Sequence, residues 1–114
     1  MDNCLFCKIV RGDIPSTKVY ENDKVYAFRD INPQAPVHIL VVPKEHSANI
    51  LEGVDRKDGI MVALTEAIAE IVRQAGIDKT GFRVITNCGK DGAQSVEHLH
   101  FHILGGKQLT EQMA

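Results

Sequence analysis

Three histidines at every second position form the part of this chain that is best suited to chemistry. Residues 98–104 read His-Leu-His-Phe-His-Ile-Leu and contain three of the five histidines in the protein. Alternation with a period of two predicts a β-strand with one buried face, so the apolar residues should face the core: Leu99, Phe101 and Ile103. The three imidazoles, His98, His100 and His102, would then share the opposite face, about 6.5–7 Å apart. One imidazole could attack an atom while the next holds a substituent of that atom, because histidine serves as nucleophile, acid, base or ligand near neutral pH.

A loop of small and polar residues directly precedes this strand. Residues 87–95 read Asn-Cys-Gly-Lys-Asp-Gly-Ala-Gln-Ser. Backbone N–H groups of such a loop can approach an anion closely, as in phosphate-binding loops, although Gly, Asn and Asp also occur in ordinary hairpin loops. Because this loop leads into the histidines, it could hold the substituents of a phosphorus atom that an imidazole attacks.

Cys4 and Cys7 form a Cys-x-x-Cys pair close to the N-terminus. This spacing suits metal binding or redox chemistry better than a disulfide framework, and two reduced thiols without metal are a further reading. Cys88 is the third cysteine, and we expect it to be a free thiol.

The remaining patterns predict an antiparallel sheet that positions the histidines. Apolar residues recur at three and four positions from Arg56 to about Gln74, which predicts one long helix that stops at Gly76. Met61 and Val62 widen its apolar stripe and hint at a second buried surface, such as a subunit contact. Alternating and β-branched segments predict the other elements: a short helix over 4–10, a hairpin of strands 18–21 and 25–28, a central strand over 37–42, and a strand over 82–87 beside the histidine strand. The elements together predict an α+β fold.

Length and composition favour a single globular domain over residues 1–114. A chain of 114 residues can bury one core but not two. With 44% hydrophobic and 25% charged residues and a formal net charge of -2, the chain has no bias toward nucleic acid or membranes. The sequence has neither a secretion signal nor a run near the ~18 apolar residues of a membrane span. We therefore expect a cytoplasmic protein without nucleic-acid or membrane partners.

Residues 98–104 match the motif His-φ-His-φ-His-φ-φ, in which φ is apolar, and the chain resembles the histidine triad (HIT) superfamily of nucleotidyl hydrolases and transferases. The resemblance runs from about Cys4 to Leu109 and is strongest to the Hint branch, the histidine triad nucleotide-binding proteins of bacterial type with an N-terminal Cys-x-x-Cys. Four further segments carry it: residues 30–38, 42–46, 94–96 and 104–108. It implies a HIT-like fold, with a five-stranded antiparallel sheet, one long helix, a short N-terminal helix, and a sheet continued across a homodimer.

The resemblance also implies roles for individual residues. His100 would be the nucleophile on the α-phosphorus of a nucleoside monophosphate ester or amide, while His102, Ser95 and His38 would support the phosphate, the leaving group or the nucleophile. The other implied nucleotide contacts are Gln94 and the loop at Ala93 near the phosphate, Asn87 and Asp30 at the ribose, and Phe28, Ile31 and Leu40 around the purine. The last three could equally be plain core, since apolar strand residues are usually buried.

For members with this cysteine pair, the resemblance implies a structural Zn²⁺ held by Cys4, Cys7, His46 and His98. A closed structural zinc site needs four ligands. Such a site would attach the N-terminal segment to the sheet and would remove His98 from the chemistry, for which no metal is implied.

The function expected from the sequence is that of a purine nucleoside phosphoramidase, a hydrolase that cleaves AMP–N bonds to amines or lysine through a nucleotidyl-histidine intermediate on His100. One alternative is hydrolysis of dinucleoside polyphosphates or adenylylsulfate. Others are a nucleotide-binding regulatory module with incidental turnover, and a zinc or redox protein built on the cysteine pair. Residues 109–114 lack the tryptophan and proline tail of the better-known eukaryotic Hint proteins, so the leaving group stays open.

Overall fold

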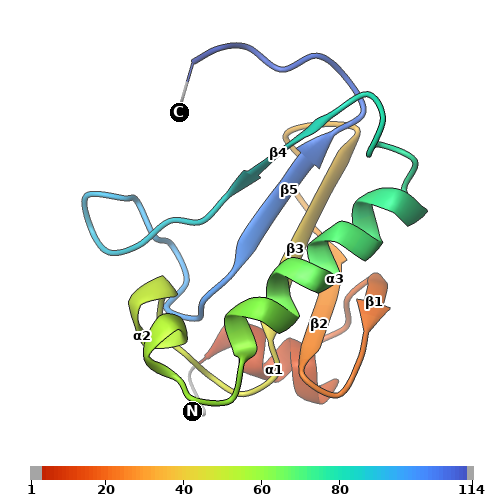
Figure 1. Ribbon diagram of the computed structural model, residues 1–114. Coiled ribbons are helices and arrows are strands. Elements are labelled where there is room, and N and C mark those ends of the chain that lie inside the picture. Colours follow the sequence, from red (N-terminus) through yellow and green to blue (C-terminus); the bar gives the residue numbers. More distant parts are fainter. Residues whose placement is uncertain (1–3, 113–114) are drawn as a thin grey trace.

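The computed structural model describes residues 4–112 and contains a five-stranded antiparallel sheet (Figure 1). The strand order is β1-β2-β3-β5-β4, with every neighbouring pair antiparallel. In chain order the elements are α1 Leu5–Arg11, β1 Lys18–Glu21, β2 Val25–Arg29, β3 Val37–Pro43, α2 Ile50–Asp55, α3 Ile60–Gln74, β4 Phe82–Ile85 and β5 Phe101–Gly105. The predicted α+β fold, with one long helix and a short N-terminal helix, is confirmed.

The two faces of the sheet have different roles. One face packs against α3 and forms the main core, which includes the predicted core residues of the histidine segment: Leu99, Phe101 and Ile103. The opposite face carries a second apolar cluster in which α1 residues Phe6 and Ile9 contact Phe28 and Leu40. Cross-strand register places Leu40 directly between Phe28 on β2 and His102 on β5. The histidines therefore lie on the face covered by α1, away from the long helix.

The predicted start of the long helix at Arg56 is wrong, because a separate helix, α2, ends there. Arg56 caps the C-terminus of α2 in an extended conformation, and Gly59, with a left-handed φ of 75°, precedes the first residue of α3, Ile60. The predicted stop is confirmed, since Ala75 caps α3 and Gly76 has a φ of 74°. Apolar periodicity alone could not detect this break between two helices.

The strand formed by the histidine segment begins only at Phe101. Residues before it bond to a different part of the chain: the Leu99 N–H donates to the Ser47 carbonyl at 2.6 Å, and the His98 ring donates to the Pro43 carbonyl at 2.9 Å. The neighbouring strand also ends early, at Ile85, and the next residue bonds to the histidine segment through its side chain: the Thr86 hydroxyl donates to the His100 carbonyl at 2.7 Å.

Met61 and Val62, which together hinted at a second buried surface, differ in their surroundings. Met61 packs against the main core, whereas the Val62 side chain is 62% exposed. Within residues 4–112, no helix has the length and apolar character needed to cross a membrane.

Candidate active site and metal centre

His100 is held as a neutral ring with one free nitrogen. Its Nδ1 lies 2.7 Å from the backbone carbonyl of His98, and since a carbonyl only accepts, Nδ1 carries the proton. The other nitrogen, Nε2, then carries a lone pair. Burial lowers the pKa of His100, so the ring stays neutral at physiological pH. A neutral imidazole with a bare Nε2 is the form that can attack phosphorus.

A chain of hydrogen bonds fixes the tautomers of the two other histidines on this face. The Gln34 N–H donates to His38 Nδ1 at 3.0 Å, so His38 carries its proton on Nε2. That nitrogen lies 2.9 Å from His102 Nδ1 and 3.4 Å from a carboxylate oxygen of Asp30. His102 therefore accepts at Nδ1 and presents an N–H at Nε2, which is a donor suited to a phosphate oxygen.

Burial also keeps these two rings neutral. It lowers the pKa of His38, against the opposing effect of the Asp30 carboxylate. For His102, burial and then repulsion by His100 and His38 lower the pKa to about 4. Asp30, His38 and His102 also offer ligand atoms within 4.8 Å of one another. The chain of proton donors and acceptors described above accounts for both rings without requiring an ion.

An apolar cavity of about 360 Å³ opens beside His100 and His102. Its lining includes seven of the predicted residues: Phe28, Asp30, Ile31, Leu40, Ser95, His100 and His102. Phe28 and Leu40 are buried in the second apolar cluster, while Ile31 is 91% exposed at the rim and so is not a core residue. The cavity combines apolar walls with one carboxylate at its edge, which suits a base and its sugar hydroxyls.

His102 also lines a second cavity, of about 690 Å³. This cavity is lined by His38, by residues of the predicted phosphate loop (Asn87, Asp91, Gly92 and Ala93), and by Arg83 and the C-terminal residues 107–110. His102 thus stands at the junction of the two cavities. A phosphate between His100 and His102 would have room on both sides, for a nucleoside and for a leaving group.

The loop before the histidine segment is held by its own side chains. Asn87 donates to the Gly92 carbonyl at 2.8 Å, and the Ala93 and Gln94 N–H groups donate to the carbonyls of Lys90 and Gly89. Gln94 bonds through its amide nitrogen to the carbonyls of Ala48 and Val96, and its oxygen accepts from the Gly89 N–H. In this structure the Gln94 side chain fixes the loop through these hydrogen bonds, whereas the exposed Ser95 lines the smaller cavity.

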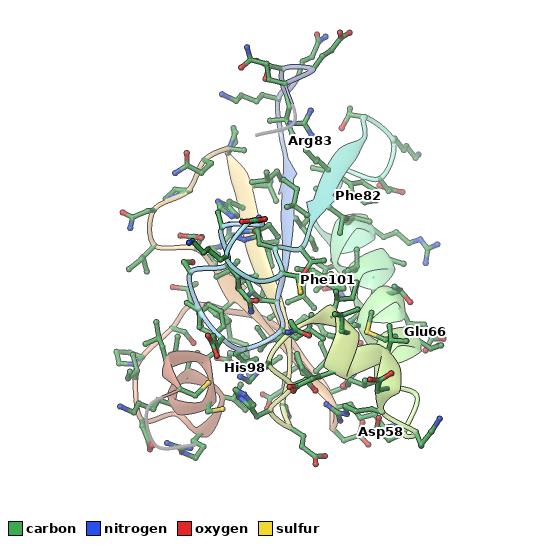
Figure 2. The ribbon with its side chains drawn as sticks, turned by 90° about the vertical axis from the view of Figure 1, so that its left-hand side faces the viewer. Asp58, Glu66, Phe82, Arg83, His98 and Phe101 are labelled. Atoms are coloured by element: carbon green, nitrogen blue, oxygen red, sulfur yellow. The ribbon has the colours of Figure 1, made fainter. Side chains whose placement is uncertain are left out.

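Cys4, Cys7, His46 and His98 converge on one point, as the resemblance implies. Their ligand atoms all lie within 4.8 Å of one another. His98 Nδ1 lies 3.1 Å from Cys4 Sγ and 3.4 Å from Cys7 Sγ, and His46 Nδ1 lies 3.4 Å from Cys7 Sγ. Figure 2 shows His98 beside α1, the helix that carries Cys7. The four residues come from three separate parts of the chain.

The protonation states of these ligands suit a bound cation. Because His98 Nε2 donates to the Pro43 carbonyl, Nδ1 is the unprotonated nitrogen, and it is the one that faces the thiols. Burial lowers the pKa of His98 to about 4, which keeps its ring neutral. Burial and the adjacent Cys4 raise the pKa of Cys7 to about 11, so two thiolates side by side require a compensating positive charge. Two sulfur and two nitrogen donors fit tetrahedral Zn²⁺.

Sequence reasoning missed several groups that orient these rings. The Gln34 N–H, the Pro43 carbonyl and the His98 carbonyl are backbone groups, which every residue type carries. Arg56 is a side chain that was also missed; it contacts the segment that carries His46. The sequence signals no role for the backbone groups, since their contacts depend on the path of the chain.

Comparison with known proteins agrees with the fold. The HIT domain profile matches residues 11–109. The chain is 54% identical to a histidine triad protein from Clostridium difficile, with a TM-score of 0.92 and coverage of 98% of this chain and 96% of that one. It is 43% identical to a HIT family hydrolase from Clostridium thermocellum, with a TM-score of 0.94 and coverage of 100% and 99%. A 14 kDa zinc-binding protein of Brassica juncea is 45% identical over 93% of this chain and 95% of its own length. The chain belongs to the HIT family.

Proposed function

We propose that the chain is a purine nucleoside phosphoramidase that cleaves the P–N bond between AMP and an amine. The observation that carries this proposal is the state of His100, a neutral ring whose bare Nε2 lies beside a cavity with apolar walls and a carboxylate. The hydrolase name of the Clostridium thermocellum relative supports hydrolysis in general. The choice of an amine as leaving group rests on the resemblance to the Hint branch.

The proposed reaction has two displacements at phosphorus. His100 Nε2 forms a bond to the α-phosphorus while the bond from phosphorus to the amine nitrogen breaks, and the departing amine takes a proton from solvent. Water then attacks the same phosphorus, the bond to His100 breaks, and nucleoside monophosphate leaves. Covalent catalysis by a histidine divides one difficult step into two easier ones in this way.

Other residues support the two steps. The Nε2–H of His102 is free to donate to a non-bridging phosphate oxygen as negative charge develops there. Ser95 lines the smaller cavity together with His100 and His102, so its hydroxyl can bond to the phosphate or to a leaving group held at the junction of the two cavities. Asp30 at the cavity edge is suited to accept from the two ribose hydroxyls.

The test uses adenosine 5′-phosphoramidate with a fluorescent amine. Wild-type protein should release the amine, and His100→Ala should not, while calorimetry shows that the variant still binds AMP. Diadenosine polyphosphate and adenylylsulfate are assayed in parallel. Cleavage of these anhydrides alone would replace the proposal with the polyphosphate or adenylylsulfate hydrolase, and AMP binding without any cleavage would replace it with a nucleotide-binding module.

We propose that Zn²⁺ is the ion held by Cys4, Cys7, His46 and His98, with a structural role. The name of the Brassica juncea relative supports this choice, as does the donor set of two cysteines and two histidines. Zinc content of the purified protein, compared with that of a Cys7→Ser variant, tests it.

We also propose a cytoplasmic homodimer whose sheet continues across the two subunits. Within residues 4–112, strand β4 forms an outer edge of the sheet, and its residues Phe82 and Val84 are each 42% exposed. Exposed apolar residues on a sheet edge favour pairing with another strand. Light scattering should give the mass of two chains for the wild type and a smaller mass for Val84→Lys.

A further inference from the structure

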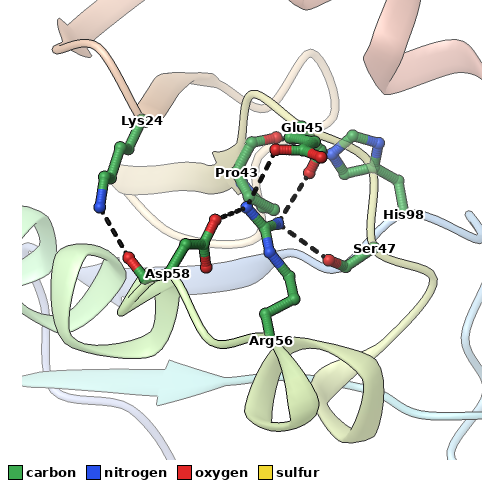
Figure 3. A network of polar contacts seen from close by, with 7 residues as sticks. All are labelled: Lys24, Pro43, Glu45, Ser47, Arg56, Asp58 and His98. Atoms are coloured by element: carbon green, nitrogen blue, oxygen red, sulfur yellow. Dashed lines mark hydrogen bonds and ion pairs between the residues drawn. The ribbon is translucent and has the colours of Figure 1, made fainter.

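Arg56 hydrogen-bonds through its side chain to the segment that carries the proposed metal ligand His46. Its side chain is 18% exposed and extends from the end of α2 toward residues 44–48, which lie between β3 and α2 without helix or strand structure. Figure 3 shows the contacts: one guanidinium nitrogen, Nη1, donates to the Glu45 carbonyl and to the Ser47 hydroxyl, both at 3.0 Å. The two residues that Nη1 contacts are the immediate neighbours of His46.

The same segment also orients His98. The Pro43 carbonyl accepts from His98 Nε2, which turns Nδ1 toward the thiols, and the Ser47 carbonyl accepts the N–H of Leu99. Residues 43–47 thus supply one metal ligand and hold a second one in place. Arg56 is the side chain that ties the middle of this segment to α2.

Helix α2 provides a firm base for this contact. A side chain at Gly53 would meet Leu99 Cδ2 at 2.8 Å, so α2 packs directly against the residue that follows His98. The guanidinium is also charge-compensated, since Nη2 donates to Asp58 and lies 3.6 Å from a Glu45 carboxylate oxygen. The hydrogen bond from Arg56 lowers the pKa of Asp58, which keeps that carboxylate ionised. A neutralised guanidinium can approach a dication site without repelling the ion.

We infer that Arg56 is a positioning residue of the metal centre: it fixes the peptide around His46 and, through residues 43–47, the ring of His98. This inference rests on the proposed Zn²⁺ centre and extends it to a residue outside the ligand set. In other metal sites, removal of a group that orients a ligand lowers the metal affinity by about 10- to 100-fold.

The experiment measures the affinity of the full chain for Zn²⁺ by competition with a chromogenic chelator. Arg56→Met should weaken Zn²⁺ binding by about 10- to 100-fold, and Arg56→Lys, which keeps the charge and one donor group, should lie between it and the wild type. Arg73→Met is the matched control, because Arg73 is an exposed residue in the last turn of α3, and its Zn²⁺ affinity should equal that of the wild type.

Two further measurements separate positioning from a loss of stability. Visible absorption of the Co²⁺-loaded protein reports the ligand set, and Arg56→Met should change it in the direction of His46→Ala. Ile71→Val in the main core destabilises the fold at a distance, and it should leave both the Zn²⁺ affinity and the Co²⁺ spectrum unchanged.

Three results would overturn the inference. Equal Zn²⁺ affinity in Arg56→Met and wild type removes the role of Arg56 and leaves the metal centre intact. Equal losses in Arg56→Met and Ile71→Val assign the effect to stability. A wild-type protein that takes up no Zn²⁺ removes the proposed metal centre together with the role of Arg56, whereas amine release by the same protein still tests the phosphoramidase proposal on its own.

Discussion

The backbone carbonyl of His98 accepts a hydrogen bond from Nδ1 of His100 at 2.7 Å. The ring of the same residue, His98, faces Cys4 and Cys7 with its unprotonated nitrogen. One residue therefore connects the candidate metal ligands, through its ring, with the candidate nucleophile, through its backbone. Any rotation of the His98 peptide would change the orientation of His100.

Removal of the proposed Zn²⁺ should slow the proposed reaction, although the two displacements at phosphorus do not involve the ion. Without an ion, the two thiols and the His98 ring lose their common partner, and the His98 carbonyl that orients His100 is held less firmly. Small displacements of a reacting group can lower rates by on the order of a hundredfold. We expect amine release to fall about 10- to 100-fold on treatment with a strong chelator, and to recover when Zn²⁺ is added back.

A chelated protein that keeps its full rate would show that the His98 carbonyl holds its position without the ion. The urea midpoint of the chelated protein is measured alongside, so that the two rates are compared only under conditions in which the fold is intact.

His102 should contribute to a loss of stability in mild acid. The pKa of this ring is lowered from 6.5 to about 4 in the folded protein, mainly by burial. Between these two pH values the unfolded chain binds more protons, so the free energy of unfolding falls as the pH falls through that interval. The destabilisation caused by protonation of this ring is absent above pH 6.5. It grows as the pH falls and reaches at most about 3 kcal/mol, reduced by solvent screening of the partly exposed ring.

Urea unfolding at pH 7.5, 6 and 5 checks this sign. His102→Gln removes the titrating ring, and its stability should depend less steeply on pH than that of the wild type over the same range. Parallel pH profiles for the two proteins would contradict the assignment of this dependence to His102.

The alternation of the histidine segment predicted its orientation well, because burial of Leu99, Phe101 and Ile103 leaves only one arrangement for the residues between them. It did not predict that the strand starts at Phe101. The earlier residues bond to Pro43 and Ser47, which are distant in sequence. Contacts of this kind depend on the fold and leave no periodic signal.

Helix α2 was missed because it is short and its apolar residues Leu51 and Val54 are exposed, so it has no apolar stripe. A local signal was nevertheless present in Asn49 and Glu52. The Asn49 side chain accepts the Glu52 N–H at 3.2 Å, and Glu52 accepts the Ala48 N–H at 2.8 Å, which is close to a capping box. That pair would have indicated a helix that begins at Ile50, ahead of the predicted start at Arg56.

Ala93 in the phosphate loop should gain stability when it is replaced by glycine. It is the one residue other than glycine with a positive φ in residues 4–112, at 58°, a conformation that L-residues adopt at a cost. We expect Ala93→Gly to stabilise the protein by about 0.5–1 kcal/mol, since the relief of strain is partly offset by the greater freedom of glycine in the unfolded chain.

Gly92→Ala is the matched opposite change. A Cβ at position 92 would lie 2.5 Å from the Cys88 carbonyl oxygen, so this variant should be destabilised by about 1–3 kcal/mol. Urea midpoints of the two variants should therefore move in opposite directions from the wild type. A downward shift for both would mean that the loop tolerates no change, and the strain argument for Ala93 would be wrong.

Ile31 should contribute to nucleotide binding and contribute little to stability. It is 91% exposed and lies at the rim of the smaller cavity, whereas Leu40, on the wall of the same cavity, is 5% exposed. A base that covers part of the Ile31 side chain would bury apolar surface at about 25 cal/mol per Å². We expect Ile31→Ser to weaken AMP binding about three- to tenfold. Its urea midpoint should stay unchanged, because the Ile31 side chain is exposed and does not pack in the core. Leu40→Ala should instead lower stability by about 2–5 kcal/mol through the cavity that it leaves. Calorimetry with AMP and urea unfolding of both variants distinguish the two walls, and unchanged AMP affinity in Ile31→Ser would move the base away from this rim.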